Sequence, residues 1–371
     1  MTVPEENVTL QTGLFGPLPL PAHRSDAHEL EDLSRRAALY ATRARGDGTR
    51  RAYRSAWKHF TAWCEALGRS PLPADPDTLA MYVVRRADDG LAVSSLRVAL
   101  AAIRTAHLLA GLSLDLRHPR LAMVLEGITR SKGVRPRRQA SPAVPGVLRL
   151  MLATRPPADT AMGARDRAML LLGFGAALRR SELVGLAIGD IEPVPGRGLR
   201  LTVRRSKTDQ HGAGQQVAVW ANPNEPGFCP AVALQAWLVF RHQAPDLAGA
   251  ASDAERPLFC GLTKAGRPIG ANLSDKAVVR LVKQAAAAAG LDPARYSGHS
   301  LRAGLATAAG DEGAGLAELM RQTRHRSTEV ALGYLRPADL WRNNVTERLF
   351  RPAPEGEGAS PRDPAPVSQA G

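Results

Sequence analysis

Hydrophobic residues recur with the spacing of an α-helix through the first third of the chain. The clearest case follows Thr49, a suitable N-cap, where apolar positions fall at steps of 4, 3, 4 and 3 residues. On a helix this spacing makes one continuous apolar stripe. The predicted stripe consists of Tyr53, Trp57, Phe60, Cys64 and Leu67.

The same spacing predicts four more helices before residue 130. One covers residues 30–44, one runs from the Asp75-Pro-Asp start to about Ala87, and two others open at Ser94 and at Pro119. Proline suits a first helical position, where its missing N–H would have no partner. The expected buried positions of the last two helices are Leu96, Leu100, Ile103, His107, Leu121, Val124, Leu125 and Ile128.

The second part of the chain mixes helical and alternating patterns. Helices are predicted near 143–153, 164–178, 231–241 and 274–289, and a strand is predicted at 257–260. Leu199, Leu201 and Val203 alternate with polar residues, and a second strand follows at 217–220 after glycines at 212 and 214, which is typical of a β-hairpin. The predicted fold class is therefore mainly α with a small β-sheet, in an α+β second domain.

Composition divides the chain into five expected segments. Residues 1–27 are predicted to be a flexible arm, 28–129 a helical domain, and 143–351 the larger domain. The intervening stretch 130–142 is rich in charge, Gly and Pro without an apolar period, so it is expected to be a linker. Residues 352–371 are rich in Pro, Gly, Ser and Glu, which is typical of disorder.

The charge balance indicates a polyanionic partner. Lys and Arg total 49 against 35 Asp and Glu, a net charge of +14, and the pI is about 10.6. Arginine outnumbers lysine, which suits bidentate phosphate contacts, although a high-GC genome gives the same bias. The longest apolar run, 168–178, has 11 residues and is too short to span a bilayer. We therefore expect a cytoplasmic protein with no membrane partner.

Residues able to handle a phosphodiester are concentrated between residues 298 and 334. His299 and Arg302, three residues apart, project from one face of a helix that Ser297 could cap. His325 follows Arg302 by 23 residues, and Tyr334 follows nine residues later, with Gly333 expected to bend the backbone and Pro337 to close the segment. Singly, each His is more often structural, and a Tyr is more often a core aromatic.

The ordered set resembles the tyrosine recombinase (phage integrase) family, whose second motif reads His-x-x-Arg, then a His or Trp, then a Tyr. In that family the first catalytic arginine follows an apolar helix, in the position taken here by Arg179. Ala177 replaces the commoner glycine, Arg180 is expected to point elsewhere, and the alternative role for Arg179 is an i, i+3 pair with Glu182. The family also places a hairpin lysine in the active site, which implies Lys207 in Ser-Lys-Thr, although a lysine at a hairpin tip is usually just solvated.

The resemblance implies that the six residues share one active site. Tyr334 would be the nucleophile, Arg179, Arg302 and His325 would hold the phosphate, His299 would act as base, and Lys207 would act as acid. It also implies a 3′-phosphotyrosyl intermediate, no metal and no cofactor, and a homotetramer on double-stranded DNA. The alternatives are a type IB topoisomerase and a DNA-binding regulator with a relict site. Three distant cysteines, Cys64, Cys229 and Cys260, show neither metal-ligand nor disulfide spacing.

Basic residues of the first domain and of the linker are candidates for binding the DNA backbone. The helical bundle resembles the SAM-like core-binding domain of the family, and the helix after Thr49 is basic beside its apolar stripe. A charged helix face is most often only solvated. The candidates are Arg50, Arg51, Arg54, Lys58, Arg97 and Arg104 on helices and Arg135, Arg137 and Arg138 in the linker. The amphipathic segment 338–350 would either pack on its own domain or, as the family implies, dock on a neighbouring protomer.

Overall fold

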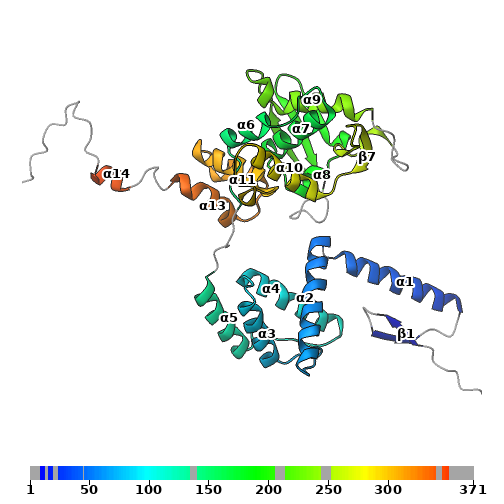
Figure 1. Ribbon diagram of the computed structural model, residues 1–371. Coiled ribbons are helices and arrows are strands. Elements are labelled where there is room, and N and C mark those ends of the chain that lie inside the picture. The colour runs from blue at the N-terminus through cyan, green and yellow to red at the C-terminus, as the bar shows by residue number, and fades with distance from the viewer. Residues whose placement is uncertain are drawn as a thin grey trace, which may run out of the picture. The chain divides into compact units, whose positions relative to one another are not determined.

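The computed structural model describes residues 9–12, 16–19, 24–44, 46–133, 140–204, 214–243, 252–339 and 345–350 (Figure 1). The chain forms two compact units, residues 1–139 and 140–371. The boundary falls inside the stretch 130–142 that was expected to link two domains. Arg135, Arg137, Arg138, Lys207 and the tail 352–371 lie outside the described residues.

The first unit is helical, with a short hairpin before it. Its elements are β1 (Thr9–Thr12), β2 (Gly16–Pro19), α1 (Arg24–Arg43), α2 (Asp47–Ala66), α3 (Pro76–Asp88), α4 (Val93–Leu109) and α5 (Pro119–Lys132). β1 and β2 pair antiparallel, and α1 begins four residues before His28. The first 27 residues, predicted to be a flexible arm, therefore include β1, β2 and the start of α1, and α5 takes in the first three residues of the predicted linker.

Apolar side chains of α2 to α5 form the core of the first unit. Phe60, Leu79, Leu96, Ile103 and Leu121 are fully buried. This confirms the predicted stripes, with two corrections in α2. The helix begins at Asp47 after an extended Gly46, not after Thr49, and its C-cap residue Leu67 leaves helical geometry with 59% of its surface exposed. α4 likewise begins one residue before the predicted Ser94.

His107 of α4 fastens the loop before α3 to the core. Its ring is buried, Nε2 accepts a hydrogen bond from the Ala74 N–H at 2.9 Å, and Nδ1 lies 2.8 Å from the Ile103 carbonyl oxygen. Because Nε2 accepts, Nδ1 carries the proton and donates to Ile103. This histidine is therefore a satisfied structural residue.

The second unit combines nine α-helices with two small sheets within the described residues. The helices are α6 (Pro145–Ala153), α7 (Ala161–Gly175), α8 (Arg180–Val184), α9 (Pro230–Arg241), α10 (Asp275–Ala288), α11 (His299–Asp311), α12 (Leu316–Thr323), α13 (Thr328–Asp339) and α14 (Val345–Phe350). The strands are β3 (Ile191–Val194), β4 (Gly198–Val203), β5 (Gln215–Trp220), β6 (Cys260–Leu262) and β7 (Pro268–Asn272).

The predicted hairpin is part of an antiparallel sheet of order β3-β4-β5. Leu199 pairs with Val219 and Leu201 with Val217, so the apolar residues of both strands point to the same face. The sequence did not predict β3 or β7. The strand expected at 257–260 is shorter, because Pro257 makes only an isolated bridge to Ala187 and β6 starts at Cys260.

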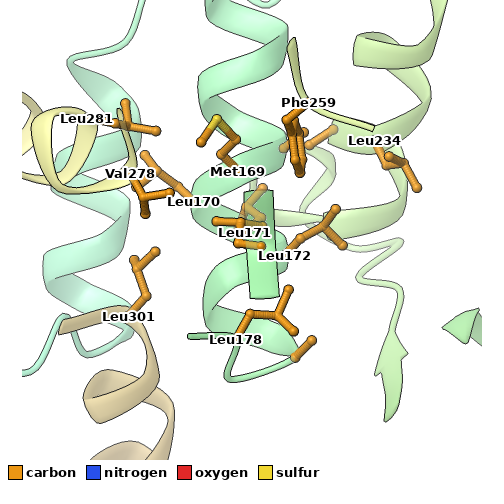
Figure 2. Packing of buried hydrophobic residues seen from close by; sticks show 14 of the residues in the cluster. Met169, Leu170, Leu171, Leu172, Leu178, Leu234, Phe259, Val278, Leu281 and Leu301 are labelled. Atoms are coloured by element: carbon orange, nitrogen blue, oxygen red, sulfur yellow. The ribbon is translucent and has the colours of Figure 1, made fainter. Parts of the chain in front are cut away.

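Helix α7 runs through the centre of the second unit. From Ala168 onward it is apolar on all sides, as expected for an enclosed helix, and Met169, Leu170, Leu171 and Leu172 are buried. Figure 2 shows side chains from α9, α10 and α11 gathered around it, with Phe259 on the same side as Leu234. At Gly173 an added Cβ would lie 2.8 Å from Leu301 Cδ1, so a glycine lets α11 approach α7 closely. This contact places the first turn of α11 beside the end of α7.

The start of the second unit is bonded to the approach and first turn of α11. The Ser141 N–H donates to the Arg295 carbonyl at 2.7 Å, and the Ala143 N–H donates to the Ser300 carbonyl at 2.9 Å. An added Cβ at Gly304 would lie 2.1 Å from the Ala143 carbonyl oxygen. Glycine at 304 is therefore required for this contact.

A further sequence expectation concerns the end of α13. Helix α13 continues from Thr328 to Asp339, so Gly333 lies inside it and Pro337 does not end it as predicted. Pro337 costs one backbone hydrogen bond, which a helix stabilised by packing tolerates.

No described helix is long and apolar enough to cross a membrane. Cys64, Cys229 and Cys260 are buried and free, and no described His, Cys, Asp or Glu residues form a group of three fit for a metal ion.

Candidate active site

Tyr334 of α13 and His299 of α11 face each other. His299 Nε2 lies 3.1 Å from the Tyr334 hydroxyl oxygen. Ser297 Oγ accepts a hydrogen bond from the His299 N–H at 3.2 Å, although the N-cap position itself is Gly298. The phenol is half-buried, and burial raises its pKa while the charge of Arg302 opposes that rise. Partial burial and the charges of Arg302 and Arg179 lower the pKa of His299, whose outer edge is exposed to solvent.

His325 lies against the other side of the tyrosine. The two rings stack with centroids 5.8 Å apart and planes 16° apart. Thr323 Oγ1 lies 2.6 Å from the Leu319 carbonyl, to which it donates, and 2.8 Å from His325 Nδ1. Because a hydroxyl has one proton, Thr323 accepts from Nδ1–H, which leaves Nε2 as the free edge of the ring. Burial and the charges of Arg302 and Arg179 lower the pKa of His325 to about 4.

Arg179 is placed by a tight turn after α7. Ala177 adopts a left-handed conformation with φ +46°, a region that glycine enters without strain. This explains why glycine is the commoner residue at that position in the family resembled by the sequence. The expected pair with Glu182 is present, with Arg179 Nη1 2.6 Å from Glu182 Oε1. Arg180 points away, to Asp275 Oδ2 at 3.0 Å, as expected.

Arg302 is almost fully buried beneath this turn. Its Nη1 donates to the Ala177 carbonyl at 2.7 Å, and its Nη2 is buried without a hydrogen-bond partner within the described ranges. Burial lowers the pKa of Arg302 to about 10, helped by the charges of Arg179 and Arg324 and opposed by Glu182. A guanidinium nitrogen with unused donor capacity, in a cluster of three positive groups and one carboxylate, is suited to an anion.

Arg324 is the charged residue that the sequence did not single out as part of the site. It is 6% exposed, its Nη2 lies 2.9 Å from Glu182 Oε2, and its Nη1 donates to the Ala176 carbonyl at 2.8 Å. The next-but-one residue before it, Gln322, donates to the Gly175 carbonyl at 2.7 Å. These side chains satisfy carbonyl groups at the end of α7. The positive charge of Arg324 also stabilises the negative end of the α7 helix dipole. The sequence offered only the position of Arg324 beside His325 as a signal.

The structure thus brings together five of the six sequence candidates: Arg179, His299, Arg302, His325 and Tyr334. Lys207 falls between β4 and β5, outside the described residues. The candidates of the first unit are exposed along two helices: Arg50, Arg51, Arg54 and Lys58 on α2, and Arg97 and Arg104 on α4. Chemically, the second unit holds a phenol against a neutral imidazole, within reach of several guanidinium groups.

Comparison with known proteins agrees with this geometry. Residues 146–340 match the model of the phage integrase family. An integrase/recombinase xerD homolog of Selenomonas ruminantium is 33% identical over 323 residues, covering 86% of this chain and 90% of the relative. A tyrosine recombinase of Synechococcus elongatus is 31% identical, covering 83% of this chain and 90% of the relative. The chain therefore belongs to the phage integrase family and is a tyrosine recombinase.

Solved structures show the same fold. The XerH site-specific recombinase in a post-cleavage complex with a palindromic difH substrate matches with a TM-score of 0.52 and 18% identity, over 74% of this chain and 71% of that chain. The Tn1549 transposon integrase with transposon right end DNA matches with a TM-score of 0.51 and 18% identity, over 77% of this chain and 91% of that chain. The predicted class, mainly α with a small β-sheet, is confirmed.

Proposed function

We propose that this recombinase breaks and rejoins double-stranded DNA through a 3′-phosphotyrosyl intermediate. The observation that carries the proposal is the 3.1 Å contact between the Tyr334 hydroxyl and His299 Nε2, beside the guanidinium groups of Arg179 and Arg302. A phenol that attacks phosphorus needs a proton acceptor and positive charge near the non-bridging oxygens. His299 can accept the proton, and Arg179 and Arg302 supply the positive charge.

The proposed cleavage step is a transfer of the phosphoryl group from the 5′-oxygen to the tyrosine. The Tyr334 oxygen forms a bond to phosphorus and its proton passes to His299, while the bond from phosphorus to the 5′-oxygen breaks. Arg179 and Arg302 stabilise the charge on the non-bridging oxygens, and an anion beside His325 Nε2 favours the protonated ring, which then donates to it. Lys207 protonates the departing 5′-oxygen. Rejoining is the same reaction in reverse, with a 5′-hydroxyl of another strand as the nucleophile.

Side chains supply every role in this step, so we infer that cleavage requires neither a metal ion nor ATP. The phosphodiester bond energy is kept in the phosphotyrosine, which makes the exchange reversible. Cleavage in excess EDTA without nucleotide is the expected result. A strict requirement for Mg²⁺ in the chemical step would contradict the mechanism.

We infer further that the protein acts on paired DNA sites as a homotetramer. The support for DNA is the net charge of +14, the exposed basic residues of α2 and α4, and the DNA complexes named for the solved relatives. For assembly, α14 offers exposed apolar residues: Leu349 is 75% and Phe350 81% exposed. The segment 338–350, of which 340–344 lie outside the described residues, would dock on a neighbouring protomer. Its place of action would be the cytoplasm, at the bacterial nucleoid.

The test of the proposed chemistry is Tyr334→Phe on a suicide substrate that traps the covalent complex. This variant should bind DNA as the wild type does and form no adduct, because only the attacking oxygen is lost. Tyr40→Phe is the matched control, since Tyr40 lies on α1 and is 64% exposed. An adduct formed by Tyr334→Phe would overturn the proposal, and a wild-type protein that binds DNA without forming one would indicate a regulator instead.

A further inference from the structure

Arg324 is a charged residue of this site that the proposed cleavage step does not use. Its side chain and that of Glu182 are 3% and 1% exposed, and their ion pair measures 2.9 Å. The guanidinium also donates to the Ala176 and Ala177 carbonyls at 2.8 and 3.3 Å. Because its hydrogen bonds point into the protein, Arg324 is not placed to touch a DNA phosphate.

The carboxylate of Glu182 is shared between two arginines. Oε1 accepts from Arg179 Nη1 at 2.6 Å, while Oε2 accepts from Arg324 Nη2 at 2.9 Å and from the Arg179 backbone N–H at 3.0 Å. An arginine alone with a carboxylate favours two parallel hydrogen bonds. Here Arg324 occupies Oε2. Within the part of the chain described, the guanidinium of Arg179 therefore contacts Glu182 through Nη1 alone. No other side chain in the described ranges bonds to the remaining N–H groups of the Arg179 guanidinium.

The backbone at Arg324 gives an independent reason to assign the side chain a role. The residue has φ +56° and ψ +40°, in the left-handed region that glycine enters without strain and other residues rarely adopt. Arginine at this position carries a backbone cost that glycine would avoid, and the ion pair with Glu182 offsets it. The left-handed turn also directs the chain from α12 into His325.

We propose that Arg324 is a positioning residue for Arg179. By keeping the second oxygen of Glu182 occupied, it prevents Arg179 from closing into a two-bond pair and leaves the free edge of that guanidinium for a non-bridging phosphate oxygen. The inference rests on the proposed function, because it assigns Arg179 to the scissile phosphate. It predicts that the harm caused by losing Arg324 depends on the negative charge of Glu182.

The test compares four full-length proteins on the suicide substrate at saturating DNA: wild type, Arg324→Gly, Glu182→Gln and the double variant. Glycine fits the left-handed backbone, so Arg324→Gly removes the guanidinium without adding strain. The rate of adduct formation by Arg324→Gly should fall at least tenfold with unchanged DNA affinity, because Arg179 closes onto Glu182. The double variant should cleave several-fold faster than Arg324→Gly, because a neutral glutamine does not hold Arg179 in a two-bond ion pair.

A merely structural role for Arg324 gives the opposite result. The double variant would then cleave no faster than Arg324→Gly, and that outcome overturns the proposal, as does an Arg324→Gly rate within twofold of wild type. Arg321→Ala, an exposed site one turn earlier on α12, should leave the rate unchanged. If Arg324→Gly shows no cooperative thermal unfolding, Arg324→Lys and Arg324→Met replace it. Lysine should retain most of the rate and methionine should not, and equal rates overturn the proposal.

The same measurements separate this inference from the proposed chemistry. The wild-type protein must form an adduct that Tyr334→Phe does not form. A missing wild-type adduct would contradict the proposed function itself, whereas a normal wild-type adduct with additive losses in the double variant would contradict only the role of Arg324.

Discussion

The hydroxyl oxygen of Tyr334 and Nε2 of His299 share a hydrogen bond of 3.1 Å, although burial shifts their pKa values in opposite directions. The raised pKa of the phenol and the lowered pKa of the imidazole both favour the neutral pair at pH 7. In the proposed mechanism the proton stays on the tyrosine until charge develops at the phosphate. Arg302 would assist the transfer, because its positive charge lowers the pKa of Tyr334 against the effect of burial.

The pH dependence of cleavage should identify His299 as the base. The neutral imidazole is the active form, so kcat/KM should fall as pH drops through the pKa of His299, which lies below its ordinary 6.5. We expect a flat profile near pH 7 and an acidic limb below about 6.5. Adduct formation by single-turnover kinetics from pH 4.5 to 8 measures it. His299→Ala should lose the limb and cleave about 10²–10⁴-fold more slowly, and a limb centred above pH 7.5 would contradict the assignment.

Acid should destabilise the second unit through His325. The pKa of this ring is about 4 in the folded protein and near its ordinary 6.5 in the unfolded chain, so the unfolded chain binds more protons between these values. The free energy of unfolding should therefore be largest above pH 6.5 and fall as pH drops toward 4. Urea unfolding of His325→Phe, which keeps a ring against Tyr334, should show a weaker pH dependence. Equal slopes for the wild type and His325→Phe would contradict the assignment.

Two helical glycines of the second unit should respond oppositely to alanine. At Gly304 a new methyl group would lie 2.1 Å from the Ala143 carbonyl oxygen, so Gly304→Ala should destabilise by on the order of 1–3 kcal/mol. At Gly333 nothing lies within 4 Å of an added Cβ, so Gly333→Ala should stabilise α13 by roughly 0.5–1 kcal/mol. Thermal unfolding measures both. Loss of cleavage by a stable Gly333→Ala protein would show that this backbone must bend during the reaction.

The basic face of α2 should set part of the salt dependence of DNA binding. Removing one arginine that binds a phosphate should reduce the slope of log K against log salt by about 0.9. Replacing Arg50, Arg51 and Arg54 together with Gln should therefore flatten the slope measured by fluorescence anisotropy.

The control for this experiment removes three arginines that each pair with a carboxylate. These are Arg120 with Asp77, Arg149 with Glu225, and Arg200 with Glu192. Their replacement changes the net charge equally and should flatten the slope less. Equal slopes for the two triple variants would leave the face of α2 as a solvated surface.

Lys207 should matter through the leaving group. If it protonates the 5′-oxygen, Lys207→Ala should slow cleavage by about 10²–10⁴-fold. A substrate with sulfur at the bridging 5′ position leaves as a thiolate and needs little protonation, so the variant should cleave it nearly as fast as wild type. Arg179→Ala should not be rescued, because its proposed role is on the non-bridging oxygens. Equal defects of Lys207→Ala on both substrates would assign the lysine to DNA positioning.

Periodicity predicted most helices, and the family motif named five residues that the structure brings together. Helices α3, α4, α5 and α10 follow directly from apolar spacing and N-terminal signals such as Asp75, whose carboxylate caps α3 by accepting from the Thr78 N–H at 2.7 Å. The resemblance to a family then ordered the site residues. Apolar spacing is a local signal in the sequence, and the family resemblance depends on a known motif.

The remaining features depend on distant contacts that no local pattern encodes. Arg324 pairs with Glu182 across 142 residues, and the left-handed turn at Ala177 is stabilised by bonds from Arg302 and Arg324 to its carbonyl oxygen. Pro337 was expected to end α13 because proline has a low helix propensity. Packing of Ala331 and Leu335 in a small core with α11 and α12 outweighs that propensity.

The Ala177 carbonyl accepts a hydrogen bond from Arg302, which lies 125 residues later in the chain. This separation has a consequence during protein synthesis. At about 5–20 residues per second, a ribosome needs roughly 6–25 s to pass from one to the other. Throughout that time the growing chain already carries the basic first unit, yet it lacks Arg302 and Tyr334. Under the proposed mechanism, a half-made molecule would carry the exposed basic residues of α2 and α4 but no nucleophile, so it could bind DNA without cutting it.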